Sequence, residues 1–179
     1  AAGNHDEKTY NVGNNKWGYY HLVLLAQNNT GYRNLMKLTT IGYLNGFYYK
    51  PRVDKSLLKK YNEGLIATSA CLAGEVTSFA VRGDYESAKK AALEHMEIFD
   101  DRFYLELQKH GIEEEERARP MLVKLSEELG IPLVATNDNH YSLREHSDAH
   151  DILFCCGMGK FKSDTDRHRY EHEQFYIKT

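Results

Sequence analysis

The feature of this sequence that most restricts its fold is the alternation of short apolar runs with longer amphipathic segments. Short runs rich in β-branched and aromatic residues are typical of strands, whereas apolar residues that repeat every three or four positions are typical of helices. Four runs of the first kind occur, and most of the chain between them has helical spacing. Alternating strands and helices favour a parallel sheet covered by helices, so we predict an α/β fold.

The predicted strands cover residues 19–25, 65–69, 103–107 and 133–136. We expect the first of them to be buried, because its run YYHLVLL is almost entirely apolar. Helix ends are marked by side chains that satisfy free backbone N–H groups, or by a glycine in the left-handed conformation. The residues expected in these roles are Asn29 or Thr30, Asp54 and Asp84 as N-caps, Gly130 as the closing glycine, and Ser142 with Glu145 as a capping box.

Composition changes along the chain suggest three parts. Residues 1–18 are polar and are predicted to form a loop or linker, residues 19–157 form the folded part, and residues 158–179 begin a connection towards a further domain. The absence of an initiator Met leads us to expect a piece of a longer protein. No apolar run approaches the roughly 18 residues that a membrane-spanning helix needs, so no membrane contact is predicted.

Charge and cysteine content limit the possible functions. Lys and Arg number 23 and Asp and Glu 26, giving a net charge of −3. A free-standing nucleic-acid-binding domain usually carries a basic surplus, so any DNA contact must be local or lie elsewhere in a longer protein. The cysteines, Cys71, Cys155 and Cys156, are odd in number and include a neighbouring pair, a poor basis for disulfides. We therefore predict a reducing, cytoplasmic environment.

Metal-binding residue types follow the predicted strands. Asp138 and His140 come directly after the fourth strand, Cys71 follows the second, and His21 lies within the first. Ligands of α/β proteins bind beyond the carboxyl ends of strands. The oxygen and nitrogen of Asp138 and His140 suit zinc or manganese, and a thiolate at Cys71 would favour zinc. Structural alternatives remain open, because a lone His or Cys can be a core residue and Asp-x-His can cap a turn.

Two positive charges lie in a predicted loop between aromatic residues. Lys50 and Arg52 occur in the stretch YYKPR, after Tyr48 and Tyr49. Basic side chains in such a loop can contact DNA phosphates, although a solvated surface loop has the same composition. We keep Lys50 and Arg52 as candidate phosphate contacts.

Several stretches, taken together and in order, resemble one protein family. Their sequences are YHLVLLAQNNTGYRNL, GFYYKPR, EGLIATSACLAGE, ATNDNHY and AHD. Each is similar to a stretch of the PHP (polymerase and histidinol phosphatase) domain in the alpha subunit of bacterial DNA polymerase III. The stretches occupy residues 20–35, 46–52, 63–75, 135–141 and 149–151.

The resemblance implies a distorted seven-stranded β/α barrel, of which this chain would hold about half. It also implies that His21, Cys71, Asp138 and His140 occupy four of the family's metal-ligand positions. The family's first motif, His-x-His, would lie upstream of this sequence. A complete barrel removes its edge strands, so half a barrel would leave edges exposed, and we expect the isolated chain to be marginally stable or to borrow contacts.

The resemblance implies a DNA-directed DNA polymerase, a nucleotidyltransferase that uses Mg²⁺, with DNA and other replicase subunits as partners. Within it, the PHP domain would be a metal-dependent phosphoesterase with 3′–5′ exonuclease potential. The first alternative is a non-catalytic scaffold that binds the proofreading subunit. A second is a free-standing phosphoesterase of the histidinol-phosphatase type, whose metal chemistry would be the same.

Overall fold

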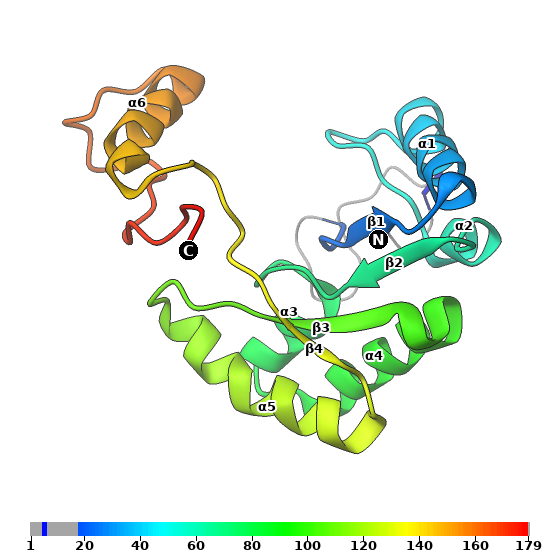
Figure 1. Cartoon of the computed structure of the whole chain (residues 1–179). Coiled ribbons are helices and arrows are strands. Elements are labelled where there is room, and N and C mark those ends of the chain that lie inside the picture. The colour runs from blue at the N-terminus through cyan, green and yellow to red at the C-terminus, as the bar shows by residue number, and fades with distance from the viewer. Residues whose placement is uncertain (1–4, 7–17, 179) are drawn as a thin grey trace.

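Short strands alternate with helices along the chain (Figure 1). The structure, a computed structural model, describes residues 5–6 and 18–178. Its elements are β1 (Val23–Ala26), α1 (Asn29–Leu44), α2 (Lys55–Lys60), β2 (Leu65–Thr68), α3 (Glu75–Val81), α4 (Tyr85–Phe99), η1 (Asp100–Arg102), β3 (Phe103–Leu107), α5 (Glu113–Leu129), β4 (Leu133–Ala135), η2 (Arg144–His146) and α6 (Ser147–Met158).

The described strands form one sheet in the order β1-β2-β3-β4. The pairs β2–β3 and β3–β4 are parallel, as predicted, but β1 and β2 are antiparallel, and here the prediction is wrong. Helices α1 and α2 and the loop between them connect these two strands and reverse the direction of the chain. Strand β2 therefore starts beside the end of β1, where Ala26 pairs with Leu65.

The reversed direction of β1 decides which residues meet at the sheet edge. The carboxyl ends of the parallel strands β2, β3 and β4 lie at one edge. Because β1 runs the opposite way, its amino end lies at that same edge. His21 thus precedes β1, in an isolated bridge with Gly74, and does not lie within the strand as predicted.

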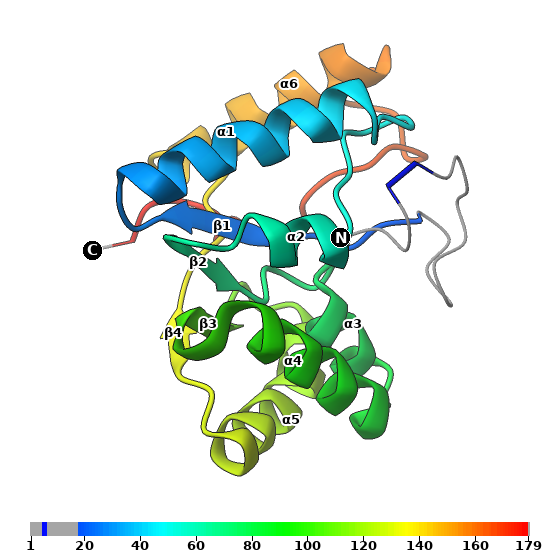
Figure 2. The same ribbon diagram turned by 90° about the vertical axis from the view of Figure 1, so that its right-hand side faces the viewer.

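Helices cover the sheet on both sides. Helix α1 packs against β1 and β2, while α4 and α5 pack against the strands from the other side together with α3 (Figures 1 and 2). Most of the apolar core lies between the sheet and the α3–α5 layer. Its fully buried large side chains are Leu38, Leu58, Leu65, Val76, Phe99, Phe103, Leu105 and Leu125.

The two outer strands of the sheet are exposed. Val23 and Leu25 of β1 keep 40% and 53% of their surface accessible, and Leu133 of β4 keeps 39%. The prediction of a buried first strand is therefore wrong, because β1 has a described neighbour on one edge only. The described residues form an open four-stranded sheet, and a closed seven-stranded barrel is not observed among them.

Most helix ends follow the sequence signals. The carboxylates of Asp54 and Asp84 accept hydrogen bonds from backbone N–H groups of α2 and α4, and Gly130 ends α5 with φ of 69°. Helix α1 is capped one residue earlier than predicted, by Asn28. The capping box at Ser142 is wrong, because a 3₁₀ turn intervenes and α6 begins only at residue 147.

The C-terminal part of the described chain folds back on the loop that follows β4. Helix α6 lies apart from the sheet, and the segment after it returns so that Tyr176 pairs with Tyr141 (Figure 1). Most of the predicted loop 1–18 lies outside the described residues. In the described part of the chain, no helix is both long enough and apolar enough to cross a membrane.

A partly buried ion pair joins α2 to α3, with a histidine of α4 beside it, and makes the stability of the fold depend on pH. Burial opposes ionisation of Glu75, but a hydrogen bond from His95 and the nearby Lys55 ammonium bring its pKa to about 2, below the ordinary 4.5. Because the folded-state pKa is lowered, this stabilisation is complete above about pH 4.5 and is lost as the pH falls towards 2.

We therefore expect Glu75→Gln to lose less unfolding free energy than the wild type between about pH 5 and about pH 3. Urea unfolding of both chains at several pH values measures this difference. Equal losses in the two chains would contradict the assignment. Glu97→Gln is the matched control, because that carboxylate is exposed and pairs with Lys59 at the surface.

Candidate metal centre

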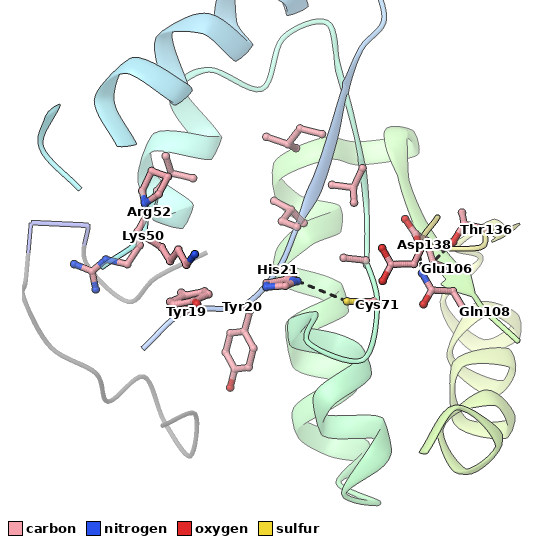
Figure 3. A pocket seen from close by; sticks show the side chains of 16 residues that line it. Tyr19, Tyr20, His21, Lys50, Arg52, Cys71, Glu106, Gln108, Thr136 and Asp138 are labelled. Carbon is pink, nitrogen blue, oxygen red and sulfur yellow. Dashed lines mark hydrogen bonds between the residues drawn. The ribbon is translucent and has the colours of Figure 1, made fainter. Parts of the chain in front are cut away.

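A cavity of about 700 Å³ opens at the edge where β2, β3 and β4 end. His21, Cys71 and Asp138, three of the predicted ligands, line it (Figure 3). Apolar side chains of β1 and of the segment before it line one side of the cavity. Lys50, in the loop before α2, also lines it. The cavity thus occupies the position where α/β proteins bind ligands.

His21 and Cys71 form the first pair of ligand-type side chains. The Cys71 Sγ lies 3.6 Å from the His21 Nδ1 (Figure 3). The His21 backbone is held by a 2.9 Å hydrogen bond from its N–H to the Ala73 carbonyl. Ala70, directly before Cys71, has a positive φ of 59°, which turns the chain sharply after β2. Local backbone geometry therefore brings the thiol to the imidazole.

Asp138 and His140 form the second pair. The Asp138 Oδ2 lies 3.7 Å from the His140 Nε2, which also contacts the Tyr170 hydroxyl at 3.2 Å. Asp138 adopts a positive φ of 41°, an uncommon conformation for a residue with a side chain. Such strain is often found at functional sites, where surrounding structure holds it.

Asn137 fixes the loop that carries this second pair. Its side-chain amide donates to the carbonyls of Gln174 and Tyr176, at 2.8 and 2.7 Å. The backbone carbonyl oxygen of Asn137 lies 2.7 Å from Nε2 of the buried His110. Burial opposes charge on His110, but its hydrogen bonds with Glu115 and with the Asn137 carbonyl outweigh this effect and raise the His110 pKa. The ligand loop is therefore tied to α5 and to the C-terminal segment.

The cavity disfavours charge on the first pair while no cation is present. Burial lowers the pKa of His21, against a smaller raising effect of Asp138. Burial also raises the pKa of the Cys71 thiol, and the Asp138 charge adds to this rise. A neutral imidazole is ready to bind a cation, whereas the thiol must lose its proton when it does.

The donor types suit a borderline cation such as zinc, which binds nitrogen, sulfur and oxygen. Within the described ranges, however, no three His, Cys, Asp or Glu side chains come close enough together to hold one metal ion. The four predicted residues lie as two pairs; His21, Cys71 and Asp138 line the cavity, whereas His140 reaches it only through its contact with Asp138. Their donor types suit such a cation, and further ligands would be needed to complete a site.

The two candidate phosphate contacts differ in their surroundings. Lys50 is exposed and borders the cavity, so its ammonium can reach a ligand there. Arg52 is only 4% exposed, and its Nε donates to the Gly46 carbonyl at 3.1 Å. DNA contact stays a prediction for both residues, and Arg52 also has a structural role in its loop.

Sequence reasoning missed Glu106, a buried carboxylate of β3 that lines the same cavity. The signal was present, because an acidic residue inside the apolar run FYLEL costs free energy unless it is paired. Glu106 lies inside the strand, whereas the predicted ligands were sought beyond strand ends.

Comparisons with known proteins identify the family of this chain. The chain is 51% identical over 160 residues to DNA polymerase III subunit alpha of Borreliella burgdorferi, covering 89% of the chain and 14% of that protein. It is 46% identical to the same subunit of Treponema pallidum, over 90% of the chain and 14% of the relative, and 40% identical to that of Thermus aquaticus, over 90% and 13%. The family model described as PHP domain matches residues 4–110, so the chain belongs to the PHP domain family.

Proposed function

We propose that this chain is part of a bacterial replicative DNA polymerase, the alpha subunit of DNA polymerase III. We further propose that it contributes a metal-dependent phosphoesterase site with 3′–5′ exonuclease activity. The chain spans 14% or less of the relatives cited above, so the remaining domains would supply the polymerase site and its Mg²⁺. The observation that carries the proposal is that His21, Cys71 and Asp138 line one cavity, with the His140 imidazole beside Asp138.

In this proposal, His21, Cys71, Asp138 and His140 hold a zinc or manganese ion together with ligands from outside the described residues. The bound cation would supply an activated water and would stabilise charge on the phosphate. The residues of this chain bind and orient the groups around it. Burial lowers the pKa of His21, which favours the form that offers a nitrogen lone pair, and Lys50 borders the cavity, where it would attract the phosphate of a DNA 3′ end.

The full-length protein would work in the cytoplasm on DNA, with other replicase subunits as partners, including a proofreading subunit. The seven-stranded barrel belongs to the same proposal. Further strands would pair with the exposed edges at β1 and β4, which are apolar enough to be buried by such neighbours. Residues 158–179 would then begin the connection towards the polymerase domain.

A scaffold role is the second candidate. It is supported by the separation of the ligand pairs, since no three ligand-type side chains converge within the described part of the chain. In this role the domain would bind the proofreading subunit without catalysis.

Primer degradation by the full-length protein, freed of its proofreading subunit, separates the two candidates. We expect loss of 3′-end degradation on chelation and recovery when zinc or manganese is added back. Two outcomes would contradict the nuclease proposal and favour the scaffold. In one, primer degradation persists in the presence of the chelator; in the other, no degradation is seen with either zinc or manganese.

A further inference from the structure

Glu106 is an acidic side chain at the cavity that the proposed metal centre does not use. It belongs to β3, it is only 6% exposed, and it lines the cavity together with Cys71 and Asp138. Figure 3 shows its carboxylate beside Asp138. A buried carboxylate is costly unless hydrogen bonds or a cation compensate it, so its surroundings indicate what it does.

Hydrogen bonds occupy both oxygens of this carboxylate. The Oε2 accepts from the Thr136 hydroxyl at 2.7 Å and from the Gln108 amide at 3.1 Å. The same Gln108 amide also donates to the Thr136 hydroxyl oxygen at 3.1 Å, which leaves the hydroxyl proton to point at Glu106. The Oε1 is bonded to the Thr68 hydroxyl. Each oxygen thus faces at least one group that can donate a hydrogen bond to it.

All three partners are neutral. Two other poorly exposed carboxylates have basic partners: Glu75 lies 2.8 Å from the Lys55 ammonium, and Glu115 pairs with His110. Among the residues that the structure describes, no Lys, Arg or His forms an ion pair with Glu106. Its negative charge is held in place by three adjacent strands but is not neutralised.

We propose that Glu106 is a positioning residue of the metal centre, whose fixed negative charge strengthens divalent-cation binding without coordinating the ion. The proposal rests on the proposed function. Its physical basis is that a fixed charge in a poorly solvated cavity attracts a cation more strongly than the same charge in water. Hydrogen bonds to Thr68 and Thr136 hold the carboxylate in place.

The test compares zinc and manganese affinity of the metal-free full-length protein with that of Glu106→Gln, by competition with a chromogenic chelator. Gln keeps the shape of the side chain and removes its charge. We expect about tenfold weaker binding, as is typical of changes next to a metal's ligands, with an unchanged thermal unfolding midpoint. Wild-type affinity in Glu106→Gln would overturn the proposal.

Two further variants separate the possible failures. Glu106→Asp retains the charge, so we expect affinity within about threefold of the wild type, which is the rescue that a purely steric role would not give. If Glu106→Gln does not fold, a tenfold loss of metal affinity in Glu106→Asp would overturn the charge account.

Asp138→Ala tests the metal centre itself. If it binds metal like the wild type, the proposed function fails, whereas loss there with full binding in Glu106→Gln refutes the role of Glu106 alone.

Discussion

Replacing Asp138 with alanine is expected to lower 3′-end degradation by the full-length protein at least about 100-fold, with nucleotide addition within about twofold of the wild type. Asp138 lines the cavity with His21 and Cys71, and its Oδ2 lies 3.7 Å from the His140 Nε2. His140→Ala should have a similar effect. Primer degradation and primer extension, measured on the same preparations, give both numbers.

The matched control for this prediction is Asp101→Ala. Asp101 is an exposed carboxylate in η1, before β3, and therefore at the opposite end of the strand from the cavity. The control should keep both activities. Primer degradation at the wild-type rate in Asp138→Ala would remove Asp138 from the site, and equal loss in both variants would indicate a general effect of charge.

Replacing Gly31 with alanine is expected to lower the unfolding free energy of the chain by about 3 kcal/mol, near the upper end of overpacking effects. Gly31 lies in the first turn of α1, against the loop before β2. A Cβ there would come within 1.8 Å of the Gly64 carbonyl oxygen, so backbone must move. The same contact aligns α1 with the start of β2, through the Gln27 N–H bonded to that oxygen at 2.8 Å.

Thermal unfolding measured by circular dichroism should show a fall of about 6 °C or more in the midpoint of Gly31→Ala. Gly157→Ala is the control. Gly157 lies in α6, and an added Cβ would meet nothing within 4 Å. Alanine favours helix over glycine by roughly 0.5–1 kcal/mol, so the control should keep or raise the midpoint. An unchanged midpoint in Gly31→Ala would contradict the close approach of α1 and the loop.

The sequence predicted the local elements well because their signals are local. Apolar runs and caps such as Asp54 and Asp84 located nearly every helix and strand. The direction of β1 could not be predicted from local sequence signals. It depends on how α1 and α2 return the chain, and this is set by packing such as the contact between Gly31 and Gly64.

The candidate site was predicted in part for the same reason. Residues 138 and 140 follow a strand directly, so their position at the sheet edge could be inferred from the sequence. The approach of His21 to Cys71 could not, since it depends on the antiparallel pairing of their strands. The role of Glu106 could not be predicted either, because it depends on hydrogen bonds to Thr68 and Thr136, which are distant from it in the sequence.

The most direct test of the proposed centre is the absorption spectrum of the full-length protein loaded with Co²⁺ in place of its native metal. Cobalt accepts the same nitrogen, sulfur and oxygen ligands as zinc, and a bound thiolate gives a sulfur-to-cobalt charge-transfer band. We expect such a band in the wild type and in the Cys156→Ser control, because Cys156 is an exposed residue of α6. The band should disappear in Cys71→Ser. A band that survives in Cys71→Ser, or cobalt binding with no thiolate band in the wild type, would contradict the proposed metal centre.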